Sequence, residues 1–190
     1  MTSSEGFQVL RASERPATAW LNGGGVTREV AGFPAGAGLD TFDWRVSLAD
    51  VASAGPFSPF PGIDRVITLV EGPGMALTVD GTERLVDEPF RPFAFSGDAT
   101  TDCRLPAGPV VDFNVMTRRG RVEAAVDLTA TATTVDVPAR STGLLVCLAG
   151  TASVDGTELT RYDAALLHTP GTYELHPIGT TAVVTFSPAL

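Results

Sequence analysis

The residue types best suited to binding chemistry in this sequence are four arginines and the polar side chains near them. The arginines, each on or beside an expected β-strand, are Arg28, Arg45, Arg65 and Arg118. The polar neighbours are Asn22, Thr27, Asp64, Asp112 and Asn114. A guanidinium group is planar and stays charged, and its forked N–H donors match the two oxygens of a carboxylate. We therefore expect this set to bind a small anion, with a carboxylate as the first candidate.

A run of three glycines at residues 23–25 stands just before Thr27 and Arg28. Glycine loses more conformational freedom on folding than other residues, so a folded chain keeps such a run where the backbone turns sharply or approaches a ligand closely. Residues 26–30 alternate apolar and polar side chains, which predicts a strand beside the glycine loop. The Asn-Gly pair at 22–23 is also a strong hairpin signal, so a plain turn explains the same residues.

Short β-strands must position these side chains, because 20 glycines and 14 prolines leave few windows long enough for a helix. Alternation is clearest in residues 42–48, where Arg45 lies on the face opposite Phe42 and Trp44, and it recurs in residues 110–116. Further strands are expected at 64–70, 75–79, 92–95, 121–128, 143–149, 164–168 and 181–186. Many short strands separated by glycine and proline turns predict an all-β sandwich or barrel.

A five-residue motif, Val-Asp-Gly-Thr-Glu, occurs twice, at 79–83 and at 154–158, each time after an apolar strand that ends in a glycine turn. A chance match of common turn residues is one explanation. Two related β-modules explain the shared flanking pattern as well, and each would be a small jelly-roll barrel of the kind found in cupins. We therefore expect an N-terminal module at 1–120 and a C-terminal module at 121–190.

The composition excludes several classes of function. The net charge of −9 repels polyanions, so we expect no nucleic-acid partner. The chain has no lysine, which excludes Schiff-base chemistry. No apolar run is long enough to span a bilayer and the N-terminus lacks a signal-peptide pattern, so we expect a cytoplasmic protein without a membrane partner. Cys103 and Cys147 are expected to be reduced thiols.

Metal binding and nucleophilic catalysis find little support in the sequence. The only histidines are His168 and His176, which lie eight residues apart with a Thr-Pro-Gly turn between them. Together with Glu174 they would supply a triad of two histidines and one carboxylate, but we expect no bound metal and no cofactor. No Gly-x-Ser-x-Gly elbow is present, so we assign no catalytic residue.

Four blocks of unusual composition follow one another along the chain. They are Trp20-x-Asn22-Gly23-Gly24-Gly25-x-Thr27-Arg28-Glu29, Phe42-Asp43-Trp44-Arg45-Val46-Ser47, Gly55-Pro56-Phe57-Ser58-x-Phe60-Pro61-Gly62-x-Asp64-Arg65 and Asp112-Phe113-Asn114-Val115-Met116-x-Arg118. In this order they closely resemble the HutD/Ves family. The resemblance covers residues 8–186 and is looser after residue 120. It implies a bicupin-like fold and an association with bacterial histidine utilisation, as a small-ligand-binding or regulatory factor without an established reaction.

The sequence thus predicts a non-enzymatic small-molecule-binding protein whose ligand is a carboxylate metabolite. The resemblance to the HutD/Ves family implies an intermediate of histidine breakdown, such as a formylated or amidated glutamate. The expected ligand-binding residues are Asn22, Gly24, Thr27, Arg28, Arg45, Asp64, Arg65, Asp112, Asn114 and Arg118. Five of them are expected to converge on one cavity in the first module, opened by the glycine loop: Asn22, Arg28, Arg45, Arg65 and Asn114. Aromatic residues that would line the same cavity are Trp20, Phe42, Trp44, Phe60 and Phe113. Any single arginine could instead form a structural ion pair, because an unpaired buried charge is costly.

Two other classes of function stay open. One is a divergent cupin enzyme, an isomerase, lyase or hydrolase that uses an aspartate or glutamate as general base on a small carboxylate or sugar. The other is an interaction protein whose barrels mainly dimerise, which keeps a homodimer among the expected partners.

Overall fold

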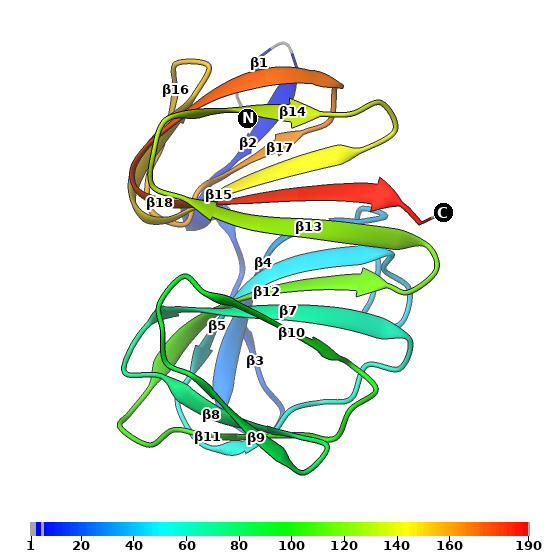
Figure 1. Cartoon of the computed structure of the whole chain (residues 1–190), viewed down its shortest axis with the longest axis vertical. Coiled ribbons are helices and arrows are strands. Elements are labelled where there is room, and N and C mark those ends of the chain that lie inside the picture. The colour runs from blue at the N-terminus through cyan, green and yellow to red at the C-terminus, as the bar shows by residue number, and fades with distance from the viewer. Residues whose placement is uncertain (1–2, 5, 190) are drawn as a thin grey trace. The chain divides into compact units, whose positions relative to one another are not determined.

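The computed structural model describes residues 3–4 and 6–189, and almost all of its regular structure is β-strand (Figure 1). Within these residues the single helical element is a three-residue 3-10 turn at Ala12–Glu14, and no helix is long or apolar enough to cross a membrane. The all-β prediction is therefore confirmed. The chain divides into two compact units, each of which forms its own core.

Unit 2, residues Pro16–Arg121, consists of two antiparallel sheets (Figure 1). The six-stranded sheet has the order β10 (Pro92–Ser96), β7 (Ile63–Glu71), β12 (Val110–Arg118), β5 (Trp44–Val51), β4 (Gly25–Phe33) and β3 (Thr18–Ala19). The four-stranded sheet has the order β6 (Gly55–Pro56), β11 (Thr101–Arg104), β8 (Met75–Val79) and β9 (Thr82–Val86). Ile67 and Leu69 from β7 share one buried core with Leu77 from β8 and Cys103 from β11. The two sheets therefore pack face to face around this core.

Unit 1 comprises the described residues up to Arg15 together with those from Val122 onward, and its strands form one antiparallel sheet. The main path is β1 (Ser3–Ser4), β2 (Phe7–Leu10), β17 (Ala164–Leu167), β15 (Thr142–Val154), β18 (Gly171–Pro188) and β13 (Val122–Thr129). Off this path, β14 (Thr133–Val137) pairs with β18 and β16 (Thr157–Leu159) with β15. The core of unit 1 is apolar, with Leu145, Val154 and Leu175 fully buried.

The repeated motif forms the same tight turn in both units. Asp80 and Gly81, with φ angles of 45° and 80°, join β8 to β9. Asp155 and Gly156, with φ angles of 46° and 78°, join β15 to β16. Two central residues with positive φ are what a type I′ hairpin turn requires, and an Asp-Gly pair adopts it readily. Both Asp-Gly pairs therefore form hairpin turns.

The division into units differs from the expected one at the N-terminus. We expected residues 1–120 to form the first module, whereas the structure pairs β2 with β17 and buries Phe7 and Val9 in the core of unit 1. Four residues are too few for alternation to reveal this strand or its partner. The second boundary between the two units lies between Arg121 and Val122, one residue from the expected boundary between residues 120 and 121.

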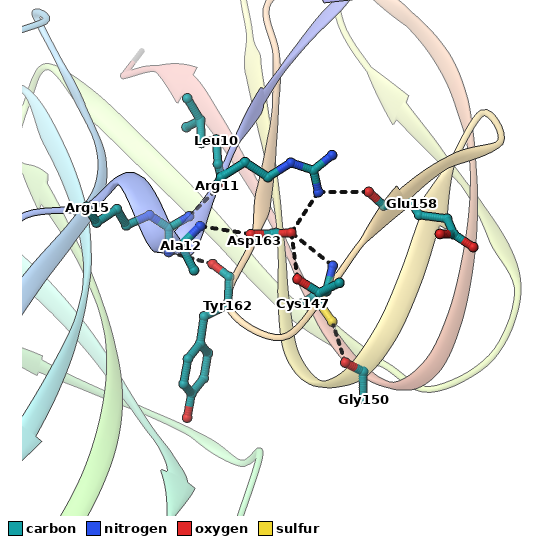
Figure 2. A network of polar contacts seen from close by, with 10 residues as sticks. Leu10, Arg11, Ala12, Arg15, Cys147, Gly150, Glu158, Tyr162 and Asp163 are labelled. Atoms are coloured by element: carbon teal, nitrogen blue, oxygen red, sulfur yellow. Dashed lines mark hydrogen bonds and ion pairs between the residues drawn. The ribbon is translucent and has the colours of Figure 1, made fainter. Parts of the chain in front are cut away.

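Hydrogen bonds to the carboxylate of Asp163 hold Arg11 and Ala12, the residues that follow β2, against the rest of unit 1 (Figure 2). Its carboxylate accepts hydrogen bonds from the Ala12 N–H at 2.8 Å and from Arg11 Nη1 at 2.7 Å. Arg15 adds donor contacts to the carbonyl oxygens of Leu10 and Tyr162. Burial alone would raise the pKa of Asp163, but these donors and Thr160 outweigh it and hold the pKa below its usual value. The N-terminal segment is thus an integral part of unit 1.

Candidate functional site

Strand register places several predicted site residues on the inner face of the six-stranded sheet, meaning the face that packs against the four-stranded sheet. Along β7, Arg65 has the same parity as the core residues Ile67 and Leu69. Along β12, Asp112 and Asn114 have the same parity as the core residue Val110. Alternate residues of a strand point to the same face, so these three polar side chains share the interior of unit 2 with its apolar core.

Arg65, Asp112 and Asn114 form a buried polar group, which we call the Arg65 cluster. Arg65 Nη2 donates to Asn114 Oδ1 at 3.4 Å, and Asn114 Nδ2 donates to Asp112 Oδ1 at 3.3 Å. The exposed fractions are 6% for Arg65, 6% for Asn114 and 1% for Asp112. Both hydrogen bonds are long, so the amide of Asn114 joins the cation to the carboxylate only loosely.

Three phenylalanine rings surround the guanidinium of Arg65. Its Cζ lies 5.0 Å from the ring centroid of Phe95, 5.3 Å from that of Phe57 and 5.5 Å from that of Phe60. Phe95 pairs directly with Arg65 across β10 and β7. Phe57 and Phe60 belong to the loop after β6, which backbone hydrogen bonds to Thr101 and Gly97 hold in place. The rings supply cation–π contacts and apolar walls.

The guanidinium of Arg65 has no close counter-charge in the part of the chain that the structure describes. Among the described residues no carboxylate oxygen lies within 4 Å of its nitrogens, and its Nε has no hydrogen-bond partner. Burial lowers the pKa of Arg65 to about 10; the charge of Asp112 acts in the opposite direction, and neighbouring Arg45 lowers it further. Arg65 is therefore still charged at neutral pH, with donors available for an additional acceptor.

Asp112 is the carboxylate that the Asn114 side chain links to Arg65. Burial raises the pKa of Asp112 to about 6. The hydrogen bond from Asn114 and the positive charge of Arg65 lower it in part, while the charge of Asp50 raises it. A carboxyl group with this pKa changes its protonation state just below neutral pH.

Two further predicted residues lie on the inner face on neighbouring strands. Arg45 on β5 pairs with Met116 of β12, which in turn pairs with Arg65 of β7. Its Nε donates to Glu29 Oε2 at 2.7 Å, so Arg45 already has a carboxylate partner. Thr27 on β4 accepts a hydrogen bond from Trp20 Nε1 at 2.7 Å. These residues lie on the same face as the Arg65 cluster but are engaged in contacts of their own.

The other predicted arginines and Asp64 have structural partners away from the cluster. Arg28 lies on the opposite face of β4, where it forms an ion pair with Asp50. Asp64 pairs at 2.7 Å with Arg119, and both side chains are about half exposed. Arg118 donates to the carbonyl oxygens of Phe42 at 2.8 Å and Asp40 at 3.0 Å. The structure therefore does not bring Arg28 or Asp64 to Arg65, because side chains of consecutive strand residues point to opposite faces.

The glycine run and Asn22 form a turn between β3 and β4. Asn22 Oδ1 accepts a hydrogen bond from the Gly24 N–H at 2.9 Å, and Gly23 has a φ of 70°. A Cβ on Gly25 would lie 2.5 Å from the backbone oxygen of Asp50, so only glycine lets β4 approach β5 this closely. The plain-turn explanation thus accounts for Asn22 and all three glycines.

Two of the three phenylalanine rings that surround Arg65 could not be identified from the sequence. Phe60 was expected to line a cavity, but Phe57 and Phe95 were not assigned to the site. The signal for Phe95 is its position in strand 92–95, yet nothing in the sequence shows that this strand pairs with the one carrying Arg65. A surface depression of about 250 Å³ lies elsewhere in unit 2, beside Glu71 and Pro109, and the Arg65 cluster does not line it.

The two histidines, His168 and His176, lie in unit 1. His176 Nε2 is 3.8 Å from Glu174 Oε2, and no group of three or more histidine, cysteine, aspartate or glutamate side chains in residues 3–4 and 6–189 is arranged to hold a metal ion. The two cysteines are buried free thiols, and burial raises the pKa of Cys103 to about 12 and that of Cys147 to about 11.

Comparison with known proteins supports the resemblance found in the sequence. The sequence model of the HutD family matches residues 12–185. A Pseudomonas putida protein described as an uncharacterized 21.2 kDa protein in the hutC 3′ region is 41% identical over 76% of this chain and 79% of its own length. Protein Ves of Citrobacter koseri is 41% identical over 58% of each chain.

A solved structure shows the same similarity in three dimensions. HutD from Pseudomonas fluorescens SBW25, described as the formate condition, is 34% identical and superimposes with a TM-score of 0.87 over 97% of this chain and 100% of its own. The fold is all-β and bicupin-like, as the resemblance implied. From the matched residues and the shared fold, the chain belongs to the HutD family.

Proposed function

We propose that unit 2 binds a small carboxylate at Arg65 and that the chain acts as a ligand-binding regulatory factor in histidine utilisation. One observation carries this proposal. Arg65 is a buried cation whose Nε has no hydrogen-bond partner and which has no carboxylate oxygen within 4 Å among the described residues. An isolated buried charge is costly, so a fold that retains one gains from an anion that binds there.

The chemistry of the surroundings favours a small carboxylate over other anions. The guanidinium fork can bind both oxygens of a carboxylate at once. Phe57, Phe60 and Phe95 provide apolar walls for the carbon skeleton of the ligand. Because Arg65 is only 6% exposed, a ligand at this position would have to be small, and the loop carrying Phe57 and Phe60 would have to move to admit it.

The link to histidine utilisation rests on the relatives. The family is HutD, and the Pseudomonas putida relative is described by its position in the hutC 3′ region. The ligand would accordingly be a carboxylate formed during histidine breakdown, with a formylated glutamate as the first candidate. We place this activity in the cytoplasm.

A thermal-shift screen tests the proposal. The purified chain is heated with histidine, urocanate, formiminoglutamate, formylglutamate, glutamate or formate. A ligand at a hundred times its Kd adds about 2.7 kcal/mol to stability, which for a chain of this size corresponds to a shift of roughly 5–10 °C. The proposal requires at least one carboxylate to shift the wild type but not an Arg65→Met variant. No shift with any of the six would contradict the histidine link.

A divergent enzyme is the second candidate, and Asp112 is the observation that favours it. A buried carboxyl group with a pKa of about 6 is suited to act as a general base near neutral pH. Incubating each carboxylate with the protein and following its NMR spectrum would separate the two functions. Turnover that disappears in Asp112→Asn would establish the enzyme, whereas unchanged spectra with retained binding favour the binding protein.

A further inference from the structure

The Arg65 cluster contains one cation and one carboxylate that do not touch. Asp112 reaches Arg65 only through the side chain of Asn114, over two hydrogen bonds of 3.3 and 3.4 Å. The three side chains lie on β7 and β12 within the same apolar interior. A ligand carboxylate on Arg65 would therefore place a second negative charge near Asp112 in a buried, largely apolar region.

Among the titratable groups near Asp112, we expect only Asp112 itself to change its protonation state when a ligand binds. Asp50 on β5 adds negative charge, and Cys103 on β11 faces Asp112 as a thiol whose pKa is raised to about 12. Arg45 on β5 lies near Arg65 but is paired with Glu29. Strands β8 and β10 face this core with the apolar side chains of Met75, Leu77, Val79, Phe93 and Phe95.

We propose that a carboxylate binding at Arg65 is accompanied by the uptake of one proton by Asp112, an inference that rests on the proposed function. Two carboxylates that share one buried cation repel each other, and one of them becomes protonated. The ligand keeps its charge because it contacts the guanidinium directly. Asp112 is farther away and fully buried, so it takes the proton, which comes from the solvent. The site then holds one positive and one negative charge.

The direction of the pH dependence follows from this exchange. In the free protein the pKa of Asp112 is about 6, and the bound anion raises it further. Below pH 6 Asp112 is already protonated, so the affinity is high and changes little. Above pH 6 binding requires a proton, and the affinity falls by up to about tenfold per pH unit until the pKa of the complex is reached. The pKa values of Arg65 and Cys103 lie outside this window.

Isothermal titration calorimetry near pH 7 measures the proton directly. The full-length chain is titrated with sodium formate and, separately, with N-formylglutamate, in buffers that differ in ionisation enthalpy. The plot of the observed enthalpy against buffer ionisation enthalpy has a slope equal to the number of protons taken up. We expect a slope approaching one proton for the wild type and a slope near zero for Asp112→Asn, whose amide mimics the neutral carboxyl group.

Asp127→Asn is the matched control, because Asp127 is an exposed carboxylate on β13 in unit 1. It should bind with the wild-type slope. Binding of either carboxylate with a slope of zero in the wild type would overturn the proton coupling and leave the proposed function intact. Absence of binding to either carboxylate at pH 5.5 and pH 7 would overturn both. If Asp112→Asn does not fold, the slope of the wild type still decides the matter.

Discussion

Asp64 and Arg65 are consecutive residues whose side chains lie on opposite faces of β7. Asp64 forms a half-exposed ion pair with Arg119 at 2.7 Å, whereas Arg65 is buried among three phenylalanine rings. A shift of one residue in strand register would exchange the two side chains and bury the carboxylate. The charge of the interior of unit 2 is therefore set by the register of β7.

Replacing Arg65 by methionine should abolish carboxylate binding without reducing the stability of the free protein. Measured at pH 5, where Asp112 with its pKa of about 6 is mostly neutral, the variant removes a poorly paired buried charge. We expect its free energy of unfolding to equal that of the wild type or to exceed it by about 1–3 kcal/mol. Denaturant unfolding and ligand-induced thermal shifts measure the two quantities.

Arg28→Met provides the control for this variant. Arg28 and Asp50 form an ion pair in which both side chains are more than 40% exposed. Such a pair contributes about 0–1 kcal/mol, so the control should retain both its stability and its ligand-induced shift. A loss of several kcal/mol in Arg65→Met with ligand binding retained would instead identify Arg65 as a structural residue.

Replacing Phe95 by leucine should weaken ligand binding, because the guanidinium group of Arg65 would lose a ring that holds it in position. The ring centroid of Phe95 lies 5.0 Å from the Arg65 Cζ. A cation–π contact contributes about 0.5–2 kcal/mol, which corresponds to a roughly 2–30-fold change in affinity. Calorimetric titration with formate measures the effect. Phe33→Leu is the control, because Phe33 is 53% exposed and stacks on Trp44. Equal losses of affinity in both variants would contradict a specific role for the Phe95 ring at Arg65.

Replacing Gly97 by alanine should displace the loop that carries Phe60. A Cβ at this position would lie 2.6 Å from the Phe60 backbone oxygen and 2.8 Å from that of Ile63. Overpacking of this kind costs about 1–3 kcal/mol and should also lower the ligand affinity. Gly38→Ala is the control, since its nearest atom would be the Thr41 hydroxyl at 3.9 Å. Thermal melts with and without ligand compare the two, and an unchanged affinity in Gly97→Ala would show that the loop does not shape the site.

Replacing Asp163 by asparagine should destabilise unit 1 and change its response to acid. The variant keeps one acceptor but loses the charge that faces Arg11, and hydrogen bonds to charged groups contribute about 1.5–3 kcal/mol each. The pKa of Asp163 is lowered by folding, so its contribution is present above the unfolded value of about 3.9 and is lost as the pH falls through the lower folded value.

Denaturant unfolding at pH 7 and at acidic pH measures this difference. The gap in stability between the wild type and Asp163→Asn should be widest near pH 7 and should narrow at acidic pH. Asp127→Asn, which removes an exposed carboxylate in the same unit, should leave the unfolding free energy within about 0.5 kcal/mol of the wild type. A gap of constant size at every pH would mean that the charge of Asp163 contributes nothing.

Alternation along the chain was enough to predict most of the strands in unit 2. The expected strand at 64–70 corresponds to β7 (Ile63–Glu71), and that at 110–116 to β12 (Val110–Arg118). In unit 1, by contrast, only residues 181–186 of the long strand β18 were expected. Pro177 and Gly179 interrupt the apolar pattern there, and it is pairing with β15 that keeps the segment extended.

The site was less predictable than the fold, and the reason is geometric. Alternation showed that polar residues share a face on each strand, but it does not say which face is the inner one. Arg28 and Asp64 are adjacent in sequence to inner-face residues and lie on the other side, with partners far away in the sequence. Phe57 and Phe95 reach Arg65 through the loop after β6 and through strand pairing, neither of which a pattern within one segment can reveal.

The path of the chain has a consequence for its synthesis on the ribosome. The Ala12 N–H and its partner Asp163 are 151 positions apart, and the whole of unit 2 lies between them. At roughly 5–20 residues per second, β2 waits on the order of ten seconds for β17 to be translated. All strands that hold Arg65 in place have left the tunnel well before then. The nascent chain can therefore complete unit 2 first, while β2, made near the start of synthesis, pairs with β17 only near its end.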